Sequence, residues 1–218
     1  MGEARAGNDP LVIQYLGLRK AIGIIGIALP FVLAGGRALF EGAGLLDSIS
    51  DYYYSSMRNV FVGSLCAVGV FLFSYRGYDW RDEVAGKIAA GSIVGVAMCR
   101  TTPAGQSSDL LGGLHLVFAA VYFVTLAVFA LVLFRKTDSP GAMTPRKRSR
   151  NRVYAICGSI IVACLGLIVV VLRLPKDSSW LSLKPVFWLE SIAVVAFGIS
   201  WLVKGEAIFK DQPNPASA

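Results

Sequence analysis

Residues 49–63 read Ile-Ser-Asp-Tyr-Tyr-Tyr-Ser-Ser-Met-Arg-Asn-Val-Phe-Val-Gly. Three consecutive tyrosines, Tyr52 to Tyr54, lead directly into a long apolar segment. A tyrosine ring suits the boundary between membrane and water, because the ring lies among lipid headgroups while its hydroxyl stays in water. Asp51 and Arg58 flank the start of the apolar segment. The stretch therefore predicts one boundary of a membrane-embedded domain.

The composition of the whole chain also indicates a membrane protein. Its 218 residues are 55% apolar and 16% charged, and the charged share is below the roughly 25% of soluble domains. The apolar residues form long runs, as in a polytopic membrane protein. We expect an all-α fold, with a domain over 18–205 and polar tails at 1–17 and 206–218. Six transmembrane helices are predicted in that domain, at about 18–36, 58–75, 85–101, 111–134, 152–172 and 186–203.

The distribution of basic residues predicts the orientation. Six spans place both termini on one side of the membrane, and the N-terminal flank and the basic segment 135–152 then share that side. Loops rich in Lys and Arg stay in the cytoplasm, so we expect both termini inside and the protein in the cytoplasmic (inner) membrane. The net charge of +7 is explained in this way and does not call for nucleic acid. Membrane lipids are the expected partners, and the sequence does not indicate an oligomeric state.

The scarcity of histidine and of paired cysteines argues against several kinds of enzyme. The chain has one histidine, which excludes a haem with two histidine ligands and disfavours a zinc hydrolase with three. The four cysteines form no C-x-x-C pair and lie in or beside apolar runs, so they are expected to be small buried apolar residues. Walker A and G-x-S-x-G motifs are absent. We expect neither a metal nor a cofactor.

Polar residues at the ends of several predicted helices converge on one layer. Glu190 and His115 each lie about one turn inside a span, and ionisable groups in a span are expensive and often functional. We expect Glu190 to pair with a cation, since an unpaired buried carboxylate costs several kcal/mol. A structural ion pair and a ligand site both fit this pattern. The candidate site residues are Asp51, Tyr53, Tyr54, Arg58, Asn59, Arg100, His115 and Glu190, and the cations considered for Glu190 are Arg58, Arg100 and His115.

This layer predicts a polar pocket on the extracytoplasmic side, which binds a lipid headgroup or a small amphiphile. One alternative is a membrane-embedded lipid hydrolase, which needs a nucleophile and a base within hydrogen-bonding distance. Another is a small proton-coupled transporter that uses Glu190. The transporter needs polar groups on both sides of the pocket, and the sequence indicates few in the inner half of the bundle. Whether the chain is an enzyme is left open by the sequence.

Four stretches carry a resemblance to known proteins. They are residues 49–63, Tyr75-Arg-Gly-Tyr78, Phe187-Trp-Leu-Glu190 and Ser200-Trp-Leu-Val-Lys-Gly205. With these motifs, most of residues 20–205 resembles a group of bacterial six-span integral membrane proteins of the DUF998 and Frag1-like type. The resemblance implies the architecture of a six-helix membrane domain. It implies no particular activity, cofactor or catalytic residue.

Overall fold

The computed structural model describes residues 10–77, 79–103, 106–107, 109–136, 144–175 and 177–208, with side chains from residue 16 onward. Residues 1–9 and 209–218 of the two predicted tails lie outside this range. Within it the chain forms helices and no strand. The long helices are α2 (Pro10–Glu41), α3 (Arg58–Phe73), α4 (Trp80–Met98), α5 (Leu110–Leu131), α6 (Pro145–Val171) and α7 (Pro185–Lys204). The short 3₁₀ helices are η1 (Ser50–Tyr54), η2 (Leu133–Arg135) and η4 (Ser179–Leu183).

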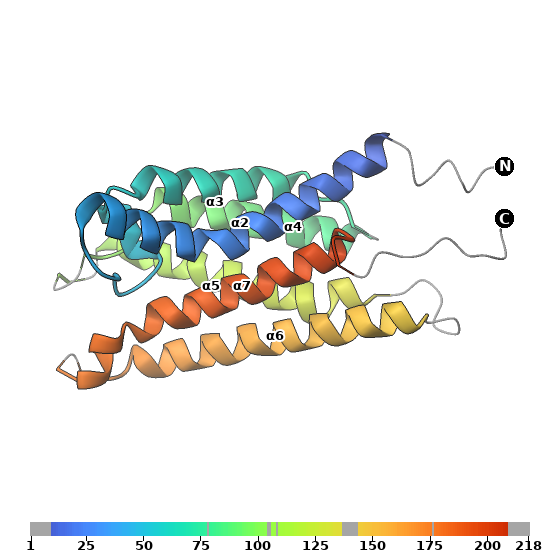
Figure 1. Ribbon diagram of the computed structural model, residues 1–218. Coiled ribbons are helices and arrows are strands. Elements are labelled where there is room, and N and C mark those ends of the chain that lie inside the picture. The colour runs from blue at the N-terminus through green and yellow to red at the C-terminus, as the bar shows by residue number, and fades with distance from the viewer. Residues whose placement is uncertain are drawn as a thin grey trace, which may run out of the picture.

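The long helices form one closed bundle. Helices that follow one another in the chain pack side by side, and α7 also packs against α2 (Figure 1). Each long helix runs between the same two ends of the bundle. We call the end that holds residues 42–57 the tyrosine end, and the opposite end, where α7 stops, the termini end.

Local sequence signals explain where several helices begin. The side chain of Asp79 accepts hydrogen bonds from the backbone N–H groups of Arg81 and Asp82 at the start of α4. Asp109 and Thr144 cap α5 and α6 in the same way. Such caps satisfy N–H groups that have no partner within the helix. Pro145 and Pro185 stand in the first turns of α6 and α7, where a missing N–H costs nothing.

Glycines bring α2 and α7 into close contact. A Cβ atom added at Gly198 of α7 would lie 2.7 Å from the carbonyl oxygen of Gly23 in α2. One added at Gly23 would lie 2.8 Å from the carbonyl oxygen of Gly198. The two backbones therefore approach more closely than side chains would allow, as is common where helices pack in membranes.

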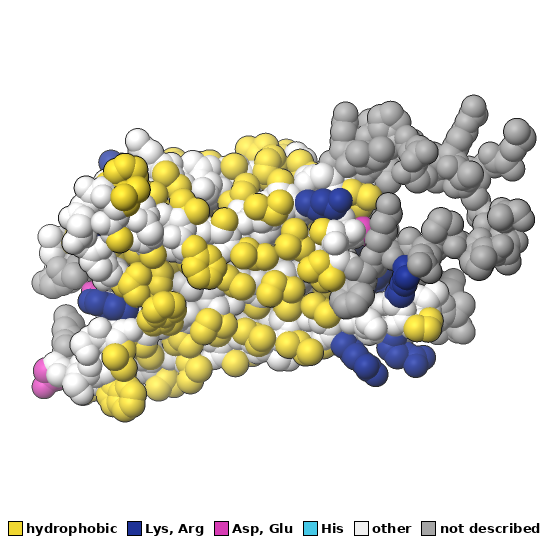
Figure 2. Space-filling model, viewed as in Figure 1, with side chains coloured by type: hydrophobic (Ala, Val, Ile, Leu, Met, Phe, Trp, Pro, Cys, Tyr) yellow, Lys and Arg dark blue, Asp and Glu magenta, His cyan; other side chains and the backbone are white. Residues whose placement is uncertain are grey.

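Four helices are long and apolar enough to cross a membrane, which indicates a membrane protein. These candidate spans are Leu16–Glu41, Leu110–Arg135, Pro145–Val171 and Pro185–Lys204. The face seen in Figure 2 carries apolar side chains along most of its length, with Lys and Arg gathered toward its two ends. Six spans were expected, and four helices have the length and composition of a membrane span. Helix α3 is apolar but short, and α4 carries Arg81, Asp82, Glu83 and Lys87 in its first half.

Some predicted boundaries differ from the structure. Helix α2 begins at Pro10, inside the stretch assigned to the polar tail 1–17. Helix α6 begins at Pro145 and not near 152, so most of the basic residues predicted to lie in a loop are helical. Thr144 and Pro145 together form a helix start, and this local signal outweighs the polarity of the first two turns.

Candidate functional site

Residues 42–57, here called the capping loop, close the tyrosine end of the bundle. Ile49, Ser50, Tyr52 and Met57 of this loop are buried. The N–H of Phe187 in α7 donates to the carbonyl oxygen of Asp47 at 2.9 Å. The loop is therefore held in the bundle by both apolar burial and backbone hydrogen bonds.

The three tyrosines of the capping loop have different environments. Tyr52 is fully buried, and its ring lies 6.0 Å from that of Phe187. Tyr53 is half-buried and Tyr54 is exposed. The Tyr54 hydroxyl donates to the carbonyl oxygen of Thr101 at 2.6 Å. A surface position fits Tyr53 and Tyr54, whereas the expectation of a hydroxyl in water is wrong for Tyr52.

Glu190 lies under the capping loop but does not form the expected ion pair. Its Oε2 accepts a hydrogen bond from the backbone N–H of Ile49 at 2.7 Å. Among the described residues, no cation forms an ion pair with it. The capping loop supplies a backbone donor at the place where a cation was expected, and this satisfies one carboxylate oxygen without a second charge.

The expected cations have other partners. Arg58 donates to the Tyr53 hydroxyl at 2.7 Å, and its guanidinium lies 4.3 Å from the centre of that ring. Arg100 forms an ion pair with Asp109 at 2.5 Å. The hydrogen bond that Arg100 donates to the Tyr54 hydroxyl is the largest cause that raises the pKa of Arg100, and the charge of Asp109 raises it further. Both cations thus stabilise the rim of the tyrosine end.

His115 joins the capping loop to two helices. Its Nδ1 lies 2.7 Å from the carbonyl oxygen of Cys99, just beyond α4, and its Nε2 lies 2.9 Å from Oγ of Ser50. A carbonyl oxygen only accepts, so Nδ1 carries the hydrogen. In the neutral ring Nε2 is then an acceptor, and the Ser50 hydroxyl donates to it. Both side chains are buried.

The two other candidate residues lie near the surface. Asp51 is half-buried and accepts from the Ser48 hydroxyl at 2.8 Å. Burial raises the pKa of Asp51 above its ordinary value, partly offset by that hydrogen bond. Asn59 is exposed in the first turn of α3. The structure therefore brings Glu190 and His115 to the inner side of the capping loop, and leaves Asn59 outside it.

An interior cavity lies directly beneath the capping loop. Five helices, all but α6, contribute to its wall, and the part open to water-sized molecules measures about 60 Å³. Its polar lining residues are Ser50, Ser64, Tyr122 and Glu190, and the rest of the wall is apolar. An apolar cavity with a few convergent polar groups has the lining of a small-molecule site, but its volume is below the roughly 300–1,000 Å³ of such sites, so it must widen to hold more than a small group.

A second hollow lies on the outside of the bundle, where α7 is flanked by α2 and α6. This groove measures about 560 Å³ and is almost entirely apolar. Phe31, Ile156 and Trp188 line it, and Trp188 stands near the tyrosine end of α7. The three helices that form it, α2, α6 and α7, are labelled in Figure 1.

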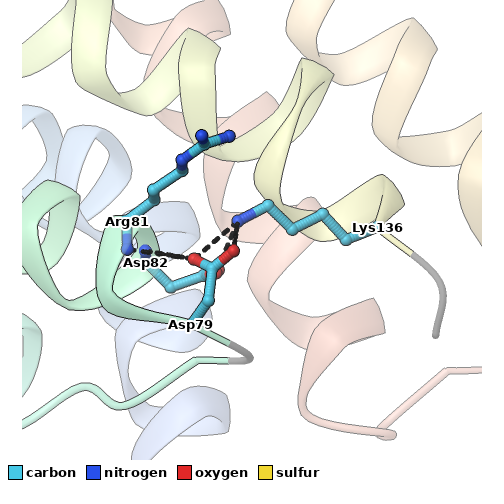
Figure 3. Close-up of polar contacts among 4 residues, drawn as sticks. All are labelled: Asp79, Arg81, Asp82 and Lys136. Carbon is cyan, nitrogen blue, oxygen red and sulfur yellow. Dashed lines mark hydrogen bonds and ion pairs between the residues drawn. The ribbon is translucent and has the colours of Figure 1, made fainter.

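The termini end carries a partly buried ionic cluster that the sequence analysis missed. Lys136 donates to both carboxylate oxygens of Asp79 at 2.9 Å and to Oδ2 of Asp82 at 2.8 Å (Figure 3). The Asp82 side chain is fully buried, whereas Lys136 and Asp79 are partly exposed, and Oδ1 of Asp82 has no hydrogen-bond partner among the described residues. The hydrogen bond from Lys136 is the main cause that lowers the pKa of Asp79 to about 2. Burial alone lowers the pKa of Lys136, but the hydrogen bonds to Asp82 and Asp79 raise it on balance.

Lys204 adds a second buried cation at this end. It is the last residue of α7, 8% exposed, and its Nζ lies 5.4 Å from the centre of the Phe134 ring. Its carbonyl oxygen accepts from Arg19 at 3.3 Å. The expectation that the inner half of the bundle carries few polar residues is therefore wrong. The sequence signal was an Asp three residues before another Asp at a helix start, a capping pattern that places both near the first turn.

Comparisons of the chain with models of protein families, with curated proteins and with solved structures find no match. The resemblance to DUF998 and Frag1-like proteins therefore stays a prediction. Within the described part of the chain, no group of three or more His, Cys, Asp or Glu side chains could hold a metal ion.

Proposed function

We propose that the chain is a six-span protein of the cytoplasmic membrane with both termini in the cytoplasm. The closed bundle supports this, because α3 and α4 run beside helices that are long enough to cross. At 1.5 Å per residue, the 19 residues of α4 extend about 28 Å, close to the hydrocarbon thickness of about 30 Å. Lys and Arg residues at the termini end favour a cytoplasmic position for that end. Those in described positions are Arg19, Lys20, Arg76, Arg81, Arg135, Lys136, Arg146, Lys147, Arg148, Arg150, Arg152 and Lys204.

We further propose that the protein binds a membrane lipid or another small amphiphile in the interior cavity. The observation that carries this proposal is the position of Glu190. Its carboxylate lines an apolar cavity, forms no ion pair with any described residue and accepts a hydrogen bond from the loop that closes the cavity. A polar group at one end of an apolar space suits a ligand with a polar head and an apolar body. The capping loop is then the element that must move to admit the ligand.

The experiment fills the cavity and measures binding. Native mass spectrometry of the full chain in mild detergent, with added lysophosphatidylethanolamine, reports the bound fraction. Val68→Trp places a large ring in the cavity, whereas Val70→Trp places it on the lipid-facing side of the same helix. We expect Val68→Trp to abolish binding and Val70→Trp to bind as the unmodified protein does.

A second pair of variants adds a smaller side chain, in case Val68→Trp does not fold. Ala119 lines the cavity, and its exposed neighbour Ala120 does not. Ala119→Leu should reduce binding while Ala120→Leu leaves it unchanged, and melting temperatures verify that each variant is folded. Equal binding by all folded variants would show that the ligand site lies elsewhere, with the α2–α6–α7 groove as the next place to examine.

Proton-coupled transport is a second candidate function, favoured by the ionic cluster at the termini end. Asp82 and Lys204 are buried there, at the opposite end of the bundle from Glu190. A carrier needs titratable groups near both openings of its path. Proton uptake by proteoliposomes on addition of an amphiphilic amine tests this candidate. Loss of uptake in both Glu190→Gln and Asp82→Asn supports transport, and absence of uptake in the unmodified protein rejects it.

Hydrolysis of a membrane lipid is the other alternative that the sequence suggests. It needs a nucleophile and a base within hydrogen-bonding distance. Ser50 lines the cavity and His115 lies behind it, and the two side chains are within hydrogen-bonding distance of each other.

A further inference from the structure

We propose that Ser50 and His115 are a nucleophile and its general base, and that they hydrolyse a carboxylic ester whose apolar part occupies the interior cavity. This inference rests on the proposed function, since the cavity must first admit an amphiphile. It adds a reaction, two residues with defined roles and a substrate class.

The first argument is the hydrogen bond between the two side chains. Ser50 Oγ lies 2.9 Å from Nε2 of His115, within the range at which a serine can pass its proton to a histidine. Ser50 also lines the cavity, so its hydroxyl is at the boundary between the base and the space for a ligand. A nucleophile must contact both its base and its substrate, and Ser50 is placed to do so.

The second argument is the tautomer of His115. Cys99 follows the last turn of α4, where carbonyl groups have no partner within the helix. Its carbonyl oxygen accepts from Nδ1 of His115 at 2.7 Å, which places the hydrogen on Nδ1. The neutral ring therefore presents an unprotonated Nε2 to Ser50, as a general base requires. The carbonyl of Cys99 orients the ring in the way that a third group does in hydrolases with a nucleophile and a base.

Further hydrogen bonds position the pair when the capping loop is closed. His115 lies in the second turn of α5, behind the cap that Asp109 provides. The N–H of Ile49, next to Ser50, donates to Glu190. Each partner therefore belongs to an element that has hydrogen bonds of its own.

The reaction balances with water as the only co-reactant. Ser50 Oγ attacks the ester carbonyl carbon while its proton passes to Nε2, and the alkoxide leaves with that proton. The acyl group is then bound to Oγ as an ester. A water molecule gives a proton to Nε2 and attacks the acyl carbon, after which the bond to Oγ breaks and Oγ recovers the proton. The net change is an ester plus water to a carboxylic acid plus an alcohol.

The lining of the cavity selects the substrate class. Its apolar wall suits a hydrocarbon chain, and its aromatic rings, such as Phe61 and Tyr122, add contact area. Among the residues that the structure describes, the wall holds no Lys, Arg or His side chain, so an acidic lipid would find no counter-ion in the cavity, which favours a neutral or zwitterionic ester. The substrate class is thus a neutral or zwitterionic carboxylic ester with an apolar acyl or alkyl part.

The test uses the full chain in mild detergent with two probes, an alkyl fluorophosphonate and para-nitrophenyl octanoate. The fluorophosphonate should modify the unmodified protein, and peptide mass spectrometry should locate the adduct on Ser50. Ser50→Ala should lose the adduct and the esterase activity. Ser92→Ala is the matched control, because Ser92 is a buried serine of α4 that does not line the cavity, and it should react as the unmodified protein does.

His115→Asn tests the base without removing the contact to Cys99, since an amide N–H can still donate to that carbonyl oxygen. We expect it to slow modification of Ser50 about 100-fold, within the usual effect of losing a general base. A purely structural hydrogen bond predicts no adduct on Ser50 in any variant. An adduct whose rate does not change in His115→Asn would likewise overturn the proposal.

Lysophosphatidylethanolamine binding, measured on the same samples, separates this inference from the proposed function. Binding without an adduct on Ser50 overturns the hydrolase and leaves the amphiphile-binding function in place. Absence of both binding and adduct in a folded protein overturns both. If Ser50→Ala and His115→Asn fail to fold, the position of the adduct in the unmodified protein still decides the outcome.

Discussion

Glu190 carries a carboxylate whose hydrogen bond comes from a backbone N–H and not from a cation. This difference changes what a substitution should do. If Glu190 were half of an ion pair, neutralising it would leave a buried cation without a partner. With Ile49 as the partner, only a hydrogen-bond acceptor is required at this position.

Glu190→Gln should therefore leave the free energy of unfolding within about 0.5 kcal/mol of the original, because the amide oxygen still accepts from Ile49. Glu190→Leu should cost about 1–3 kcal/mol, since it leaves the buried N–H of Ile49 without an acceptor. Denaturant unfolding in detergent measures both. Equal destabilisation by the two variants would mean that the charge has a structural partner.

Asp82 presents the opposite case, a buried carboxylate that depends on a cation. Lys136→Met should destabilise the protein by about 3 kcal/mol, the lower end of the range for a broken buried ion pair, because Lys136 is partly in water. The double variant Asp82→Asn with Lys136→Met should recover much of this loss, since no buried charge then lacks a partner. If the double variant is as unstable as the sum of the single ones, the pair is not coupled.

Asp79 should make stability depend on pH in a defined window. Its folded-state pKa of about 2 lies below the ordinary value of 3.8, so its ion pair is fully stabilising above about pH 4 and is lost as the pH falls toward 2. Asp79→Asn keeps the helix cap but removes the titration. Melting temperatures between about pH 4 and pH 2 should fall less steeply in Asp79→Asn than in the unmodified protein. Parallel curves would contradict this.

The sequence predicted which residues lie together at the tyrosine end, but it did not predict their hydrogen-bond partners. Burial cost and helix spacing correctly indicate that Glu190 and His115 lie at the same end as the tyrosines. The partners depend on how the capping loop folds into the bundle, and no periodicity describes an irregular loop. Ser50 was missed for this reason: it stands beside Asp51 in the quoted stretch, but only the loop conformation turns it toward His115.

At the scale of helices, apolar runs predicted the order and number of long elements, because hydrocarbon-spanning segments have a fixed minimum length. Their ends were less predictable. Helix α4 begins at Trp80, whereas the predicted span begins at about residue 85. The charged residues Arg81, Asp82 and Glu83, predicted to lie in a loop, are therefore helical. Those charges are accommodated because Asp82 is paired with Lys136 inside the bundle, a contact between segments far apart in the chain.

The contact between α2 and α7 should tolerate no added methyl group. Gly198→Ala would place Cβ against the carbonyl oxygen of Gly23, so the helices must separate, at a cost of about 1–3 kcal/mol. Gly35→Ala is the matched control, because a Cβ there meets no atom within 4 Å, and it should be neutral or slightly stabilising. Thermal unfolding in detergent compares the two. A stable Gly198→Ala variant would show that α2 and α7 can adjust their separation freely.

At the scale of the whole molecule, the bundle has two polar ends of different character. The tyrosine end is closed by a loop over an interior cavity, and the termini end by a partly buried ionic cluster beside basic helix ends. In the orientation proposed above, the excess of Lys and Arg keeps the termini end in the cytoplasm. The cavity would then lie toward the opposite side of the membrane.

Cysteine labelling in intact cells tests that orientation, in a variant whose four native cysteines are replaced by alanine. Exposed positions are available at both ends: Arg76 and Arg148 at the termini end, and Ser107 and Ser179 at the tyrosine end. A membrane-impermeant maleimide should label Ser107→Cys and Ser179→Cys and should leave Arg76→Cys and Arg148→Cys unlabelled until the cells are opened. Arg76 is the decisive position, because it lies in the turn between α3 and α4, the two helices that length and composition alone do not assign to the membrane. If Arg76→Cys is labelled while Arg148→Cys is protected, the number of spans is four. If Arg76→Cys and Arg148→Cys are both labelled while the two tyrosine-end positions are protected, the orientation is reversed and the cavity lies toward the cytoplasm.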